Sequence, residues 1–197
     1  MGDYGAIADV GETLITLLRD NMSDLFPDPV ASVALLSPAD VEDQNVRLTL
    51  FLYSVVENPH LKNQEMRNLS PTQLGYPPLT LDLYYLLTAY ASTQNTDGTL
   101  DEHRILGRAM RIFYDNSILS GTILQGSLAG TSEELRITSN AISLDDLTKI
   151  WSAFQEVGYR LSVSYLVTPA NIDSTRDMSM QRVVSKEMNH SFMVPKG

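Results

Sequence analysis

The sequence has 197 residues, 43% hydrophobic and 19% charged, with no cysteine and a formal net charge of −10. The length fits one domain, and the composition is that of a globular protein. The lack of cysteine excludes disulfides, thiolate nucleophiles and cysteine metal sites, and the acidity argues against a nucleic-acid partner. No apolar run approaches the length of a membrane span, and the N-terminal residues carry acids where a signal peptide carries bases, so we expect synthesis and assembly in the cytoplasm.

The N-terminal part of the chain predicts one helix and two strands. Residues 7–21 place Ile7, Val10, Leu14, Leu17 and Leu18 at helical spacing. Prolines surround a short strand expected at 31–36, and the run VRLTLFLYSVV at 46–56 is typical of a strand covered on both faces. Residues 1–43 hold nine acids and one arginine, a bias that indicates a solvated surface.

The stretch PPLTLDLYYLLTAY at 77–90 alternates apolar and more polar residues with the period of a strand. We expect it to be the central strand of the sheet. Asp82 lies on its less apolar side, where a paired or solvated structural carboxylate is the ordinary interpretation.

A proline-rich connection at 58–75 precedes this strand and has little helical period. Connections of that length are uncommon within a compact domain unless they take part in the function or contact another molecule. We therefore expect a surface loop, with candidate interface residues Asn58, Pro59, His60 and Leu61.

The remainder of the body alternates helices with strands. The pattern predicts a helix at 100–114 capped by Thr99 or Asp97, a helical turn at 118–124, a strand at 135–139, a helix begun by Ser143 with Asp146 as a capping box, and a last strand at 159–168. The predicted fold class is α+β, with one mixed β-sheet flanked by about three helices in a single domain at 1–169.

Residues 170–197 differ in character from this body, with four bases, three acids and four of the eight methionines. They show no regular apolar period, so we expect an extended C-terminal arm that gains its contacts from a neighbouring molecule. The candidate interface residues there are Met178, Met180, Val183, Val184 and Phe192.

No catalytic or metal-ligating set emerges from the sequence. His60, His103 and His190 are scattered, and Asp101, Glu102 and His103 are consecutive residues that point in different directions on a helix. The segment at 121–127 approaches a phosphate-binding loop but lacks its lysine and does not follow a strand. We expect no enzyme, no cofactor and no metal, although carboxylates brought together by folding leave a small hydrolase open.

Several of these blocks, in matching order, resemble one family. They are LFLYSVVENPHLKN at 50–63, PLTLDLYYLLTAY at 78–90, EHRILGRAMRIFYDNSIL at 102–119 and LDDLTKIWSAFQEVGYRLSVSYLVTP at 144–169. The chain from about Tyr4 to Pro169 is similar to the cap, or tail-terminator, proteins of phage-tail-like contractile injection systems of the virulence-cassette and antifeeding-prophage type.

The resemblance implies a structural protein without catalytic residues or cofactor. It implies a ring, expected to be hexameric, that contacts the tube and sheath proteins of the same particle and stops their polymerisation at the end away from the baseplate. The alternative is a stand-alone adaptor that binds a protein or membrane partner through its arm.

Overall fold

A computed structural model describes residues 4–62, 64–92, 95–155 and 157–179 of the chain. These residues form two compact units. The main unit falls within residues 1–63 and 78–173, and the small unit within residues 64–77 and 174–197.

The main unit contains a six-stranded sheet in the order β1-β2-β5-β8-β7-β6. β1 runs parallel to β2, and every other neighbouring pair is antiparallel. The sheet is therefore mixed, and the predicted α+β fold class is confirmed. The strands are β1 (Val33–Ala34), β2 (Leu48–Glu57), β5 (Leu79–Ala89), β6 (Ile118–Ser120), β7 (Glu134–Ser139) and β8 (Ser162–Ile172).

The strand β5 lies at the centre of this sheet, between β2 and β8, as its period predicted. Tyr85 and Leu87 point into one hydrophobic cluster, and Leu86 points into a second cluster on the opposite face. All three side chains are buried. The alternation of β5 therefore places a core on each side of the sheet.

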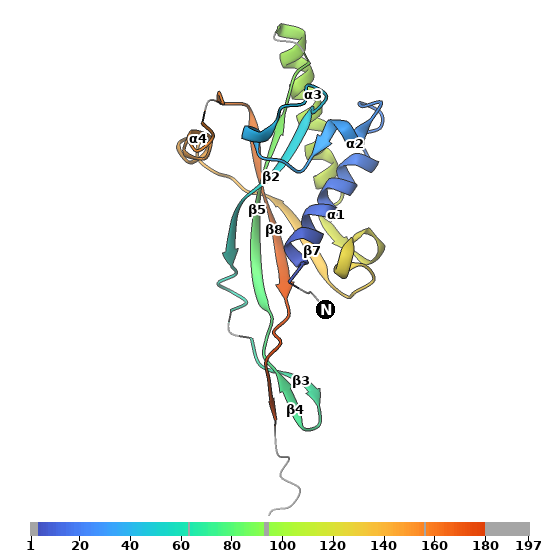
Figure 1. Ribbon diagram of the computed structural model, residues 1–197, viewed down its shortest axis with the longest axis vertical. Coiled ribbons are helices and arrows are strands. Elements are labelled where there is room, and N and C mark those ends of the chain that lie inside the picture. Colours follow the sequence, from blue (N-terminus) through green and yellow to red (C-terminus); the bar gives the residue numbers. More distant parts are fainter. Residues whose placement is uncertain (1–3, 63, 93–94, 156, 180–197) are drawn as a thin grey trace, which may run out of the picture. The chain divides into compact units, whose positions relative to one another are not determined.

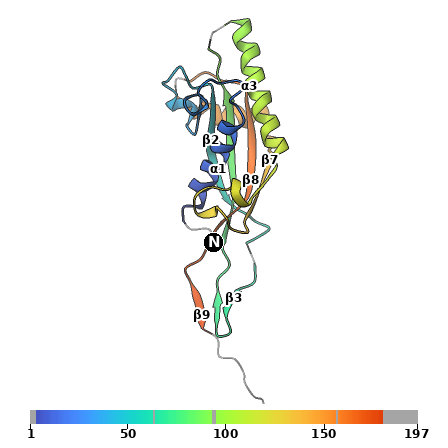
Figure 2. The ribbon, with the colours of Figure 1, turned by 90° about the vertical axis from the view of Figure 1, so that its right-hand side faces the viewer.

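Two long helices cover one face of the sheet, α1 (Ala6–Asp20) and α3 (Thr96–Asp115). They lie on the right of the strands in Figure 1 and in front of them in Figure 2. Phe113 of α3 meets Tyr165 of β8 edge to face, with 4.9 Å between ring centroids. A short helix α2 (Pro29–Ser32) precedes β1. None of the described helices is long and apolar enough to cross a membrane.

The helix α4 (Leu144–Ser152) covers part of the opposite face (Figure 1). Trp151 and the following Phe154 pack edge to face at 5.4 Å, and Phe154 also meets Phe51 of β2 at 5.6 Å. The predicted cap is confirmed, because the Ser143 hydroxyl accepts a hydrogen bond from the backbone N–H of Asp146 at 3.1 Å.

Four predictions for the main unit need correction. The cap of α3 is Asn95, whose side chain accepts from the Gly98 N–H at 2.8 Å, so the helix begins four residues earlier than expected. The strand expected at 31–36 is shorter, because residues 31 and 32 belong to α2, which Asp28 caps, and β1 is limited to Val33–Ala34. The expected helical turn at 118–124 begins as the strand β6. The last strand, expected at 159–168, is Ser162–Ile172, and it extends past Thr168 because its final residues pair with Leu79–Leu81 of β5.

The small unit contains a three-stranded sheet in the order β3-β4-β9. Its strands are β3 (Arg67–Ser70), β4 (Gln73–Gly75) and β9 (Asp177–Ser179), labelled in Figures 1 and 2. The connection at 58–75, expected to be a loop, thus contains a hairpin. Each strand has three or four residues, too short to show a sequence period. The domain boundary expected after Pro169 stays a prediction.

Candidate functional site

The outer edge of β2 is only partly paired in the main sheet. β1 pairs only with Leu48 and Thr49, and no other described strand lies beside the remainder of β2 on that side. Val55 and Val56 on this edge are 44% and 47% exposed. An edge strand with unpaired N–H and C=O groups is a template for strand addition, so the edge from Leu50 to Glu57 is a candidate contact surface.

The opposite edge of the main sheet is also only partly covered. β6 pairs with β7 at residues 134–136, which leaves Thr138 and Ser139 next to an open groove of about 930 Å³. The groove is lined mainly by apolar side chains from α3, β7 and β8, among them Met110, Phe113 and Tyr165. Tyr114 at its rim is 83% exposed. An apolar groove of this kind suits a protein contact better than a small charged ligand.

A buried hydrogen-bond network accounts for Asp82. Its carboxylate accepts from the Asn58 amide at 2.8 Å and from the Thr168 hydroxyl at 2.5 Å. The carbonyl oxygen of the Asn58 side chain accepts from the backbone N–H groups of His60 and Leu61, at 2.9 and 3.0 Å. Asp82 is therefore the paired structural carboxylate that the sequence predicted, and it fastens the turn after β2 to the sheet.

The candidate interface residues of this turn differ in burial and in their hydrogen bonds. Asn58 is 8% exposed and its side chain is bonded within the main unit, so its role there is to shape the turn. Pro59 and His60 are exposed and Leu61 is half-buried. Contact with another protein through these residues stays a prediction.

Acids and bases gather beside a large polar pocket of about 970 Å³ at the end of the main unit where β2 begins. Arg160 pairs with Glu102 at 3.2 Å and its guanidinium lies 5.0 Å from the centre of the Tyr90 ring. Arg47 pairs with Asp101 at 2.5 Å. Burial raises the pKa of the Tyr90 hydroxyl, while Thr49 and Arg160 lower it less strongly. These two ion pairs connect α3 to the segments that lead into β2 and β8.

The consecutive residues Asp101, Glu102 and His103 face different surroundings. Asp101 pairs with Arg47, Glu102 accepts from the Ala91 N–H at 2.9 Å, and His103 is exposed. Within the described residues, no group of three or more His, Cys, Asp and Glu side chains could hold a metal ion. His190 lies outside the described residues.

The loop that resembled a phosphate-binding segment holds an acid of the protein itself. The Asp9 carboxylate of α1 accepts from the backbone N–H and the hydroxyl of Ser127, at 3.0 and 2.5 Å. The Thr13 hydroxyl of the same helix accepts from the Gln125 N–H at 3.0 Å. Gly126 of this loop lies against α1, because a Cβ at that position would meet the Asp9 carboxylate.

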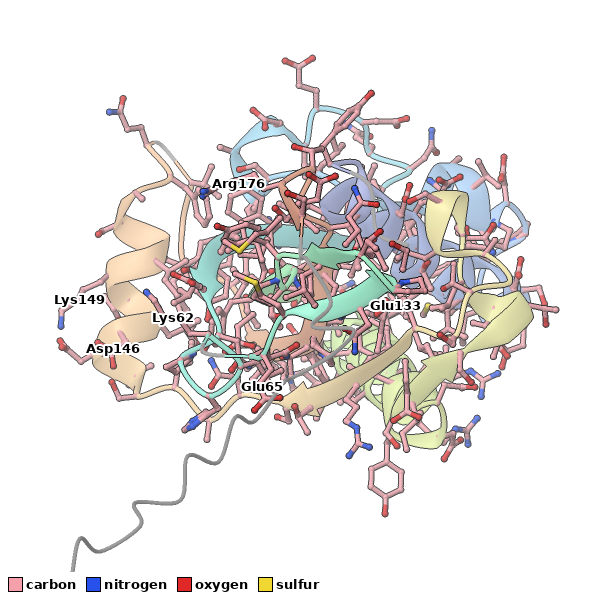
Figure 3. The ribbon with its side chains drawn as sticks, turned by 90° about the horizontal axis from the view of Figure 1, so that it is seen from below. Lys62, Glu65, Glu133, Asp146, Lys149 and Arg176 are labelled. Carbon is pink, nitrogen blue, oxygen red and sulfur yellow. The ribbon has the colours of Figure 1, made fainter. Side chains whose placement is uncertain are left out.

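The exposed polar end of α4 carries a local charge cluster. Asp146 and Lys149 extend outward from this helix (Figure 3) and lie 3.4 Å apart. Hydrogen bonding to Ser143, followed by Lys149, lowers the pKa of the Asp146 carboxyl. The cluster stabilises the helix end and provides no pocket.

The small sheet exposes its apolar side chains. Leu69 of β3 is 51% exposed and Met178 of β9 is 45% exposed. Among the described residues of the small unit, no hydrophobic side chain is in the buried core. The strands are tied by a hydrogen bond from Gln73 to Asp177 and by Arg176, which stacks over the Tyr76 ring at 4.3 Å.

Of the interface residues predicted in the arm, Met178 is placed in β9. Met180, Val183, Val184 and Phe192 lie outside the described residues. The sequence predicted the connection at 58–75 as a contact-making loop and strand edges as contact surfaces, but it identified neither the hairpin within that connection nor β2 as the open edge. The turn Ser70–Pro71–Thr72 between Leu69 and Leu74 was the one signal that indicated the hairpin.

Comparisons with known proteins were made for the sequence and for the fold. No curated protein gave a significant match to the sequence. The fold is similar to the sheath/tube terminator of the PVC extracellular contractile injection system in its extended state, with a TM-score of 0.66, 17% identity and 95% of this chain covered. It is also similar to the tube terminating cap of the anti-feeding prophage, AFP, with a TM-score of 0.61, 18% identity and 93% of this chain covered.

The chain spans 64% and 61% of the lengths of these two solved chains, which is less than two thirds of either. A family model described as the Pvc16 N-terminal domain matches residues 9–186. This match and the shared fold confirm the resemblance drawn from the sequence. The chain belongs to the Pvc16 N-terminal domain family.

Proposed function

We propose that this protein is a structural cap of a contractile injection system. It forms a ring that ends the inner tube and the sheath at the end distal to the baseplate. The observation that carries the proposal is the family match over residues 9–186, joined with a fold similar to a sheath/tube terminator and to a tube terminating cap.

The geometry of the main sheet supports this function. The β2 edge presents backbone groups and exposed valines, and the groove beside β7 presents apolar side chains. Natural proteins usually block long open edges, so a retained edge favours pairing with another chain. The two surfaces lie at opposite edges of one sheet, which allows contacts with different neighbours.

The proposed assembly is a closed homo-oligomeric ring, expected to be a hexamer. Closed rings arise when one surface of a subunit meets a different surface of the next. The proposed partners are the sheath and tube proteins of the same particle. The turn at Pro59, His60 and Leu61 and the segment after Ser179 are the proposed contact residues outside the sheets.

We propose no catalytic activity for the protein. Asp82, Asp101 and Glu102 have protein hydrogen-bond or ion-pair partners that explain their positions. A defined turnover that disappears on changing Asp82 or His103 contradicts this part of the proposal.

Two measurements test the cap function. Mass measurement and electron microscopy of the purified full chain give its size in solution, where we expect a ring and where a monomer at high protein concentration and low salt contradicts it. Particle assembly with and without the protein gives sheath length. We expect uniform sheaths with the protein and irregular lengths without it, and equal length distributions contradict a terminator.

A further inference from the structure

The small sheet has two unlike edges, β3 on one side and β9 on the other. Both edge strands are antiparallel to β4, so they run in the same direction. Exposed side chains line both edges, with Arg67, Asn68 and Leu69 on β3 and all three residues of β9. An edge of this kind is a site for pairing with a further strand.

The sheet also lacks what makes a three-stranded sheet stable by itself. Sheets of this size need an apolar face that packs on a core or on a helix. The described residues of the small unit hold no helix, and Leu69 and Met178 remain about half exposed. Additional strands at the edges pair the free backbone groups there and enlarge the sheet.

The charges on the two edges are complementary. Arg67 of β3 and Asp177 of β9 are both in register with Gly75 of β4, so the three residues form one row across the sheet. Residues of one row share a face, and both charged side chains are exposed. A basic residue therefore ends the row at one edge, and an acidic residue ends the same row at the other.

We propose that the small sheet continues from one copy of this chain to the next, through pairing of the β9 edge of one copy with the β3 edge of its neighbour. This inference rests on the proposed ring. The joined strands run parallel, and the rows meet so that Asp177 lies beside Arg67 and Met178 beside Asn68 of the neighbour.

We take the partner strand at each edge to come from a second copy of this chain, because the charges of the β3 and β9 edges are complementary. Opposite charges side by side on neighbouring strands are stabilising, and like charges are destabilising. Pairing of β9 with a second β9 would bring two acidic strands together with no base between them, and pairing of β3 with a second β3 would bring two basic strands together with no acid. Only head-to-tail pairing matches the charges, and head-to-tail contacts are those that close into rings.

Cysteine cross-linking of the full chain tests the pairing, because the natural sequence has no cysteine. The variant carries Asn68→Cys and Met178→Cys, which lie in one row across the sheet, and it keeps the charges of Arg67 and Asp177. Within one copy these positions are separated by β4, and two strand spacings amount to about 9.6 Å. A disulfide needs Cα atoms about 4.4–6.8 Å apart, so a bond between these residues forms between copies.

We expect mild oxidation to give a ladder of covalent oligomers on a non-reducing gel, up to the size of the ring. The matched control carries Asn68→Cys and Ser179→Cys, which lie on the same strands but point to opposite faces and keep both charges. The control and the two single variants should give at most dimers. A second measurement uses charge reversal, where R67D or D177R alone lowers the fraction of ring and the combined variant restores it.

The outcomes separate this inference from the cap function. Rings that persist by mass measurement, but give no ladder and no charge rescue, overturn the β9–β3 pairing and leave the ring intact, with another protein on these edges. A double-cysteine ladder equal to that of the control also overturns it. A natural chain that is monomeric overturns the ring itself.

Discussion

Asp9 on α1 binds the loop at Ser127 through two hydrogen bonds, at 3.0 Å from the backbone N–H and 2.5 Å from the hydroxyl. The neighbouring Gly126 has a φ of +59°, and a Cβ at that position would lie 2.0 Å from a carboxylate oxygen of Asp9. The loop approaches the helix this closely because residue 126 has no side chain.

The first prediction is that Gly126→Ala destabilises the protein by about 2–5 kcal/mol, the sum of a left-handed backbone cost and a forced shift of Asp9. Urea unfolding at constant pH measures it. Gly130→Ala is the matched control, since Gly130 has a φ of +69° but open space around a Cβ. We expect only about 1–2 kcal/mol there. Equal losses at both positions contradict close packing on Asp9.

The second prediction separates structure from contact in the turn after β2. Asn58→Ala leaves the Asp82 carboxylate and two backbone N–H groups short of partners, and should cost about 1–3 kcal/mol in urea unfolding. His60→Ala changes an exposed side chain and should stay within about 0.5 kcal/mol. His60→Ala should instead lower the fraction of ring. If it alters stability as much as Asn58→Ala, the division of roles is wrong.

Part of the fold could be predicted from the sequence. The central position of β5, the helix α1 and the Ser143 cap followed from local patterns of residue type, which act within a few residues of the chain. Asp82 was recognised as structural from the rarity of unpaired buried carboxylates, but its partner Thr168 was not.

The misses concern features that depend on distant residues. β6 has three residues, and its strand conformation depends on pairing with β7 at residues 134–136. β9 depends in the same way on pairing with β4, more than a hundred residues earlier. Such pairings leave no period in a short segment. The open edge of β2 becomes visible only when the strand order is known, since an edge is a property of the whole sheet.

The third prediction concerns Asp146 at the start of α4. The Ser143 hydrogen bond is the first cause of its lowered pKa, so Ser143→Ala should move the carboxyl pKa upward toward the ordinary aspartate value. A folded pKa below the unfolded one means that the stabilisation is present above the unfolded pKa and lost as the pH falls through the folded one. Carboxyl NMR titration measures the midpoint. Thr148→Ala, on the same helix, should leave it unchanged.

The last prediction concerns the segment after Ser179, where Met180, Val183, Val184 and Phe192 exceed the apolar content that a solvated end requires. We expect it to contact a neighbouring cap or sheath subunit, with residues near 180–185 adding a strand to an open edge such as that of β2. A cut after Pro169 is a poor test, because Ala170–Ile172 pair with β5 and their loss weakens the main sheet.

A chain that ends at Ser179 keeps β8 and β9 and removes only the segment in question. We expect it to unfold at the same urea concentration as the full chain, to form rings less completely and to leave sheaths of irregular length. A chain that ends at Ile172 also removes β9, and the loss of ring should then be larger because the β9 edge is gone. If the chain ending at Ser179 still forms rings and caps sheaths of normal length, the segment makes no necessary contact.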